Sequence, residues 1–286
     1  MSYTNGLDKP SDYFVTKLYS GNAGTLNITG LDFQPDWVAI KDKDATNSFM
    51  TFDSVRGVTK LLSWNTNALE ATVTPTLTSF NSDGFSIGNN TALNTNGNNL
   101  VAWNWKAGTS FTNDASGTGI GSIDSSGSVN TDAGFSIVSY TGTGSVGTIA
   151  HGLGAVPSMY ILKRRAGDTE NWPIYHQSVG NTHALYLNTT DAIYDYANFT
   201  NDTSPTSSVF TVGGSNNQAN PDGSTMIAYC FAEKQGYSKF GSYIANANAN
   251  GIFEYTGFKP AFLMIKNTAQ ATDWIMYDNK RDGFEP

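Results

Sequence analysis

One short pattern occurs three times along the chain, and it constrains the fold more than any other feature of the sequence. Each copy has a proline, five residues that are mostly apolar, and a closing lysine. The three copies are FQPDWVAIK, AVPSMYILK and FKPAFLMIK, which end at Lys41, Lys163 and Lys266. Self-similarity of this kind indicates a chain built from one repeated unit.

The sequence around the pattern repeats as well. A tyrosine followed by a turn of small residues precedes each copy, at Tyr19, Tyr140 and Tyr243. Behind the first two copies, further segments match in pairs: LLSWNT with LYLNTT, SDGFSIG with SSVFTVG, and NLVAWNW with TMIAYCF. Short segments separated by Gly, Asn, Asp and Pro are typical of β-strands joined by turns. We therefore predict an all-β chain of tandem β-sandwich, jelly-roll-like repeats of about 100 residues.

The matching segments predict where each repeat begins and ends. Repeat 1 is expected at 1–106, a Ser/Gly-rich linker that is extended or flexible at 107–131, repeat 2 at 132–236, and the first half of repeat 3 at 237–286. Half a sandwich has open sheet edges and an uncovered apolar face. We therefore expect either further sequence after Pro286 or another chain that completes the sheet.

The residues between proline and lysine predict a strand that is covered on both faces. A strand with one wet face alternates between apolar and polar residues, and this pattern does not alternate in any copy. One covering is the core of the sandwich itself, and the other is a neighbouring repeat, a second subunit or a long loop. In the third copy, we predict an interface at Phe262, Leu263, Met264 and Ile265.

Composition excludes several classes of partner. The formal net charge is −8 and the pI about 4.7, so we expect no binding to nucleic acid or to anionic membranes. The single cysteine, Cys230, excludes an intrachain disulfide, and its apolar surroundings favour a buried thiol over a nucleophile. The N-terminus lacks the basic and apolar regions of a secretion signal, and no apolar run approaches the ~18 residues that span a bilayer. Synthesis in a cytoplasm is therefore expected.

Known catalytic and metal-binding motifs are missing from the sequence. There is no GxSxG, GxxxxGK[ST] or HExxH motif, and the histidines lack metal-ligand spacing. His151 is interpreted as a turn residue rather than a catalytic one. The pairs Asp42/Asp44 and Asp168/Glu170 carry the oxygen ligands that a cation prefers, but solvated turns are the favoured interpretation. We predict no catalytic residue, no bound metal and no cofactor.

Two tryptophans at equivalent positions are the remaining candidates for a binding site. Trp172 lies beside Asp168 and Asn171, and Trp274 occupies the corresponding place in the third copy. An indole with neighbouring carboxylate and amide groups can stack on a sugar ring, so these four residues form the predicted glycan site. A core or edge-strand role is the alternative, and the repetition at one architectural position favours it.

The amino-acid sequences of several segments resemble a known repeat family. YTGTGSVGTIAHGLGAVPSMYILKRR, NWPIYHQSVG, TMIAYCFAEKQGYSKFGSY and YTGFKPAFLMIK are similar to repeats in virion structural or tail-fibre-like proteins of tailed bacteriophages of marine bacteria, cyanophages among them. The resemblance implies a non-enzymatic surface appendage of the virion, a tail fibre or similar adhesin. It further implies other virion proteins as partners, a homo-oligomer with a trimer favoured, and contact with host-surface glycan.

Three other functions remain open at this point. A capsid decoration or head fibre is one, because the first repeat begins close to Met1, where tail fibres usually have an attachment domain. A carbohydrate-binding module is the second, and it requires exposed aromatic residues near Trp172 or Trp274. A polysaccharide depolymerase is the third, and it requires two facing carboxylates in a groove.

Overall fold

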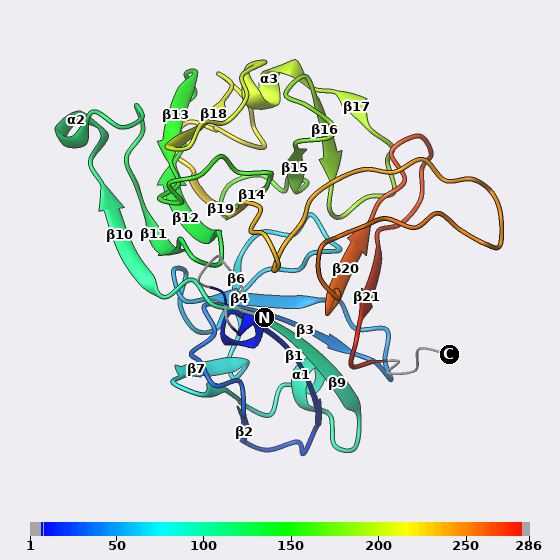
Figure 1. Ribbon diagram of the computed structural model, residues 1–286. Coiled ribbons are helices and arrows are strands. Elements are labelled where there is room, and N and C mark those ends of the chain that lie inside the picture. The colour runs from blue at the N-terminus through cyan, green and yellow to red at the C-terminus, as the bar shows by residue number, and fades with distance from the viewer. Residues whose placement is uncertain (1–6, 8, 282–286) are drawn as a thin grey trace.

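The computed structural model describes Leu7 and residues 9–281, and these residues form an all-β structure (Figure 1). Within them, no helix is longer than four residues: η1 (Pro10–Asp12), α1 (Thr91–Asn94), α2 (Ala115–Thr118) and α3 (Ala197–Thr200). The strands are antiparallel and short, as expected from the frequent turn residues. The predicted all-β class is confirmed.

The first unit (residues 14–105) is a sandwich of two main sheets. The four-stranded sheet has the order β1 (Phe14–Ser20), β9 (Asn99–Trp105), β3 (Trp37–Asp42) and β4 (Met50–Asp53). The three-stranded sheet has the order β2 (Leu26–Thr29), β8 (Gly84–Ile87) and β7 (Leu77–Asn81), and a separate small hairpin joins β5 (Lys60–Leu61) to β6 (Ala71–Thr72). The two main sheets enclose one apolar core, in which Val38, Phe52 and Phe85 are fully buried.

The second unit (residues 109–231) has a larger main sheet. Its eight strands are β10 (Thr109–Asn113), β11 (Ser125–Asn130), β12 (Phe135–Thr141), β19 (Thr225–Phe231), β14 (Met159–Arg164), β15 (Pro173–His176), β16 (His183–Tyr186) and β17 (Tyr194–Asp195), in that order. The pair β13 (Gly147–Ala150) and β18 (Val209–Val212) packs over one face. Tyr160, Phe199 and Phe210 fill the core between them.

The predicted linker at 107–131 is in fact part of the second unit. Strands β10 and β11 pair with each other and extend the main sheet beyond β12. The Oδ1 atom of Asp114 accepts a hydrogen bond from the Gly117 amide at 3.0 Å and caps the helical turn between the two strands. A Cβ on Gly127 would lie 1.9 Å from the Ile137 carbonyl oxygen, so one of the glycines that suggested a linker is required for close strand contact.

Strand order and register coincide in the two units. The order β1-β9-β3-β4 corresponds to β12-β19-β14-β15. Trp37 of β3 lies opposite Trp105 of β9, and Met159 of β14 lies opposite Phe231 of β19. The two main sheets face each other, the second unit in green and yellow above the first in blue and cyan (Figure 1). Strands β3 and β14 are therefore covered on both faces, as predicted.

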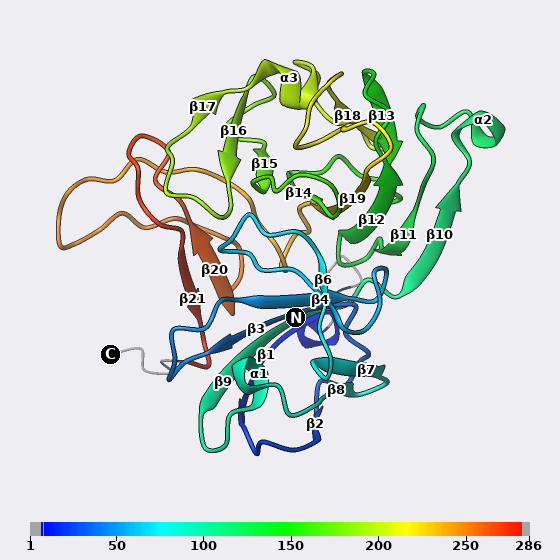
Figure 2. The same ribbon diagram turned by 180° about the vertical axis from the view of Figure 1, so that it is seen from behind.

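The third part of the described chain is one hairpin and its approach. Strands β20 (Phe262–Ile265) and β21 (Ile275–Asp278) pair with each other and lie beside both units (Figure 2). Residues 237–261 contain no strand, and they pass around the outside of the molecule. The predicted interface residues divide between two faces: Phe262 and Met264 pack against the units, whereas Leu263 is 42% exposed and Ile265 is partly buried.

Candidate functional site

The contact between the two units is a single apolar core, which we call the junction. It is contributed by the outer faces of the two main sheets. Its fully or almost fully buried aromatic residues are Trp37, Trp64, Trp103, Trp105, Phe135, Trp172 and Tyr229. Each aromatic pair of this kind contributes about 0.5–1.5 kcal/mol beyond the burial of its apolar area. The junction is therefore a buried apolar core between two sandwiches, not a solvated contact between separate domains.

Trp37 of the first unit packs against aromatic residues of the second unit. Its ring stacks on Tyr229 with centroids 4.2 Å apart and an interplanar angle of 16°. It also lies 5.8 Å from Phe135 and 6.1 Å from Phe231. Trp37 follows the proline in the repeated pattern, so the pattern places an aromatic ring at the contact between units.

The β20–β21 hairpin contacts the first unit in the way that the first unit contacts the second. Phe262 occupies the position of Trp37 in the pattern, and its ring lies 5.6 Å from Phe14 and 5.8 Å from Trp105. It also lies 6.3 Å from Trp103. These three aromatic residues occupy in β1 and β9 the places that Phe135, Phe231 and Tyr229 occupy in β12 and β19. The same contact is thus made twice.

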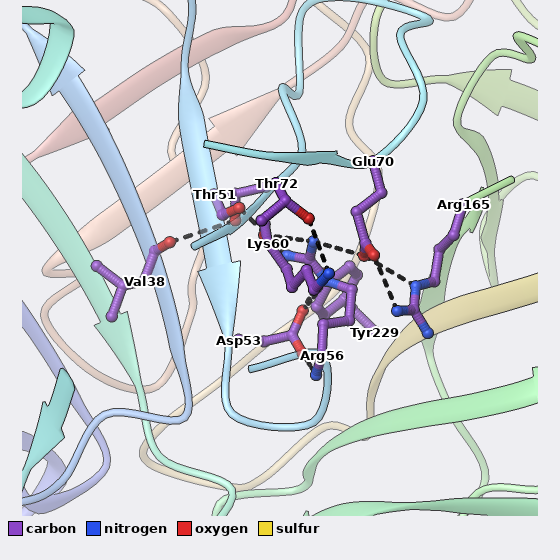
Figure 3. A network of polar contacts seen from close by, with 9 residues as sticks. All are labelled: Val38, Thr51, Asp53, Arg56, Lys60, Glu70, Thr72, Arg165 and Tyr229. Atoms are coloured by element: carbon purple, nitrogen blue, oxygen red, sulfur yellow. Dashed lines mark hydrogen bonds and ion pairs between the residues drawn. The ribbon is translucent and has the colours of Figure 1, made fainter. Parts of the chain in front are cut away.

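A network of charged and polar groups crosses the junction (Figure 3). The hydroxyl of Tyr229 in the second unit donates to Asp53 Oδ2 in the first at 2.7 Å. The Asp53 carboxylate is also paired with the Arg56 guanidinium. Glu70 joins the units a second time, because its carboxylate accepts from Arg56 at 3.3 Å and from Arg165 at 2.9 and 3.0 Å. Through Asp53 and Glu70, this network therefore joins the units at two points in addition to the apolar packing.

The charges in this network are stabilised where they are buried. The side chains of Asp53 and Arg56 have no exposed surface, which would be unfavourable for either ion alone. Burial favours a lower pKa for Arg56, but the charge and hydrogen bond of Asp53, together with Tyr229 and the charge of Glu70, outweigh burial and raise the pKa. For Glu70, burial favours a higher pKa, but the hydrogen bonds and charges of Arg165 and Arg56 lower it overall. The Arg56 guanidinium and the Glu70 carboxylate are therefore both ionised at neutral pH.

The hairpin carries a second version of this arrangement. The indole N–H of Trp103 donates to Asp278 Oδ2 at 3.1 Å, as Tyr229 does to Asp53. Asp278 is also paired with Arg281, three residues further along the chain, as Asp53 is with Arg56. The segments DSVR and DNKR carry this spacing in the sequence. This repeated spacing is the signal in the sequence that marks the network.

In the second and third copies, the closing lysine of the pattern binds the unit that precedes it in the chain. Lys163 Nζ donates to the Asn67 carbonyl of the first unit at 2.9 Å and to the Glu170 carbonyl of its own loop at 2.6 Å. Lys266 Nζ donates to the Thr190 carbonyl of the second unit at 2.9 Å. Burial lowers the pKa of Lys163 to about 8. The lysine thus supplies donors to backbone carbonyls at the junction.

The residues of the predicted glycan site do not form a binding surface. Trp172 is fully buried in the junction, and its indole N–H donates to the Thr66 carbonyl at 3.0 Å, so no ring face is available to a sugar. Asp168 is exposed, and its carboxylate accepts from Arg164 at 3.2 Å. The side chain of Asn171 is held by a hydrogen bond within the protein. The prediction of stacking is incompatible with the burial of Trp172, which has the alternative core role.

Trp274 has a related place at the contact between the hairpin and the second unit. It is partly buried against the junction, and its indole N–H donates to the Tyr186 carbonyl at 2.7 Å. Both tryptophans therefore dock on the unit that precedes them in the chain. Their equivalent positions in the sequence reflect equivalent structural contacts.

His151 is held inside the second unit. It has no exposed surface, its Nε2 atom lies 3.1 Å from the Thr206 carbonyl, and its Nδ1 atom accepts from the Leu153 amide at 3.2 Å. Burial lowers its pKa to about 4. Both ring nitrogens are occupied by backbone groups, which gives this histidine a structural role at its turn.

Among the residues that the structure describes, the His, Cys, Asp and Glu side chains form no group of three or more that could hold a metal ion. None of the helices among these residues has the length and apolar character that crossing a membrane requires.

No curated protein is similar to this chain. The model of the family described as Domain of unknown function (DUF7483) matches residues 9–286, a range that includes both units and the hairpin. The chain therefore belongs to the DUF7483 family.

Proposed function

We propose that this protein is a non-enzymatic structural component of a bacteriophage virion, a surface appendage such as a tail fibre or a similar adhesin. The observation that carries the structural role is the junction, which fuses two sandwiches through one buried core. The phage context is supported by the resemblance of the repeat sequences to virion proteins. A capsid decoration or head fibre has the same physical requirements and differs in its place on the particle.

The junction gives the chain the property that a spacer needs. Domains joined only by a linker move relative to each other unless their interface is large and apolar. Here the aromatic stack of Trp37 on Tyr229 and the bridges from Asp53 and Glu70 hold the two sheets in one orientation. A force applied to one unit is therefore transmitted to the other without a hinge.

The side chains that often perform chemistry have structural partners in this fold. His151 and the Cys230 thiol are buried. Burial raises the pKa of Cys230 to about 12, which disfavours the reactive thiolate. Asp53 and Glu70 form ion pairs with arginines at the junction. These observations favour assembly over catalysis.

Analysis of purified particles tests the proposal. Mass spectrometry of virions from the phage that encodes this chain is expected to detect it at a stoichiometry comparable to known structural proteins. Electron cryo-microscopy of the same particles is expected to show two adjoining sandwiches at a fixed angle, and their location separates tail from head. A non-structural protein of the same phage, removed during purification, is the control. Absence of the chain from the virion would overturn the proposal.

Catalysis is tested separately. The chain is incubated with envelope polysaccharide of the host, and reducing ends are measured over time. The proposal predicts no increase over a heat-denatured sample. A sustained increase would show a depolymerase and contradict the non-enzymatic role.

A further inference from the structure

The exposed apolar surface of the described chain is concentrated in its third part. Most of its exposed large hydrophobic side chains lie between residues 243 and 277. The most exposed are Ile244 (90%), Phe253 (87%) and Tyr255 (71%). Apolar side chains gathered in one region of a surface mark a contact site.

The hairpin has one covered face and one open face. Phe262 and Met264 pack against the junction. Leu263 and Tyr277 lie opposite each other on the other face and are 42% and 58% exposed. In the first unit, the corresponding pair is Val38 and Phe52, and both are fully buried in the sandwich core. The open face of the hairpin thus carries apolar residues at the positions that face the sandwich core in the first unit.

One edge of the hairpin is also open. In the described chain, β20 pairs only with β21. The equivalent strands β3 and β14 each pair on their other edge with a further strand, β9 and β19. In turn, β9 and β19 separate β3 and β14 from β1 and β12. A single strand at this edge would complete the same order.

The lack of this strand explains the irregular approach to the hairpin. Tyr243 matches Tyr19 and Tyr140, which lie in β1 and β12. The hydroxyls of Tyr19 and Tyr140 donate to the carbonyls of Leu93 and Ala219, in the second half of their own units. Residues 239–244 form no strand, because the middle strand to which their counterparts bind is not present beside them.

The register of the two complete sheets specifies the side chains of the expected strand. Positions opposite Phe262 and Met264 correspond to aromatic residues that enter the junction, and the position between them corresponds to Asn104 and Cys230, which are both buried. Read from N to C, β9 has Leu100, Val101, Ala102, Trp103, Asn104 and Trp105, and β19 has Met226, Ile227, Ala228, Tyr229, Cys230 and Phe231. The shared pattern is two aliphatic residues, alanine, an aromatic residue, a small residue and an aromatic residue.

The second unit has the receiving surface for these aromatic residues. Met159 occupies the position of Trp37 and Phe262, and it is partly buried against the junction. His176 lies opposite Met159, where Asp53 lies opposite Trp37. Since Trp37 contacts β19 and Phe262 contacts β9, Met159 is positioned to contact the strand beside β20. That strand would complete a cyclic set of three equivalent contacts.

We propose that the free edge of β20 is a docking site for one β-strand, antiparallel to β20 and carrying this six-residue pattern. The occupant is a strand of a partner polypeptide, because the strands of this chain that carry the pattern, β9 and β19, are already buried in their own sheets. A second copy of the protein could supply such a strand only by unfolding one of its units. Backbone hydrogen bonds to β20 supply affinity, and the alternating side chains supply specificity.

A peptide with the sequence of residues 98–107 is the probe. It carries the β9 pattern without a cysteine. Added to the full chain, it is expected to slow amide hydrogen exchange at Phe262–Ile265 at least tenfold and to show saturable binding by calorimetry. A control peptide, with alanine at the positions of Trp103 and Trp105, is expected to bind at least tenfold more weakly. Equal binding of the two peptides, or slowed exchange confined to other strands, would overturn the proposal.

A pair of protein variants locates the site. Leu263→Lys places a charge on the open face of β20 and is expected to abolish peptide binding. Leu18→Lys is the matched control, because Leu18 is 40% exposed on β1 and lies outside the proposed site. Circular dichroism confirms that both variants are folded. Peptide binding unchanged by Leu263→Lys, or a stable dimer that protects β20 without peptide, would contradict the proposal.

Discussion

The hydroxyl of Tyr229 offers a quantitative test of the junction, because a second buried tyrosine, Tyr160, has a hydroxyl without a hydrogen-bond partner among the described residues. Replacing Tyr229 by phenylalanine removes the 2.7 Å hydrogen bond to Asp53 and leaves the stacked ring in place. Tyr160 is also fully buried, and its hydroxyl has no hydrogen-bond partner among the described residues. Tyr160→Phe is therefore the matched control.

Only one of the two substitutions should lower stability. A hydrogen bond to a charged group contributes about 1.5–3 kcal/mol, so Tyr229→Phe is expected to lower the free energy of unfolding by about 2 kcal/mol. Asp53 keeps its pairing with Arg56, which limits the loss. Tyr160→Phe removes a buried hydroxyl that has no partner, and it is expected to be neutral or to stabilise the protein by up to about 1–3 kcal/mol.

Urea denaturation followed by tryptophan fluorescence measures both effects. Five of the six tryptophans are buried in the junction and the sixth, Trp274, packs against it, so tryptophan emission reports the opening of the junction. Burial raises the pKa of Tyr229 well above its usual value, so the phenol stays a donor across the usable pH range. A change of less than ~0.5 kcal/mol for Tyr229→Phe, or an equal loss for both variants, would refute the role assigned to this bond.

Three further predictions follow from buried groups. Burial lowers the pKa of His151 from 6.5 to about 4. The contribution of this histidine to stability is therefore complete above pH 6.5 and is lost as the pH falls towards 4, by at most about 3 kcal/mol. Urea titrations at pH 7 and 4.5 should show that His151→Gln loses less stability between the two pH values than the unchanged protein does. Cys230, whose thiol is buried, should not react with a thiol reagent at pH 8 until the protein unfolds, and rapid labelling of the native protein would contradict its burial. Asp278→Asn removes the carboxylate that Trp103 and Arg281 contact and should speed proteolysis within the hairpin, whereas Asp222→Asn, in an exposed turn, should not.

Local sequence patterns predicted the class of fold and the covering of its central strands. Turn residues between short apolar segments are enough to indicate strands, and the non-alternating run after each proline is enough to indicate two covered faces. For residues 107–131, composition predicts a linker, because serine and glycine are typical of flexible chains. In the structure, these small residues allow β11 to pack closely against β12, which composition alone does not reveal.

The polar network could not be derived from neighbouring residues. Tyr229 and Asp53 are 176 positions apart, and their contact exists only because the two main sheets face each other. Trp172 is a second example. Its polar neighbours in the sequence suggest a surface site, but its packing partners belong to the preceding unit. A repeated spacing, Asp53 to Arg56 and Asp278 to Arg281, was the one local sign of the network.

Scanning calorimetry tests the central claim most directly, which is that the two sandwiches share one core and behave as one body. If they do, the chain is expected to unfold in a single transition whose calorimetric and van't Hoff enthalpies agree. Two resolved transitions, or a calorimetric enthalpy about twice the van't Hoff value, would show that the units unfold independently and would contradict the account.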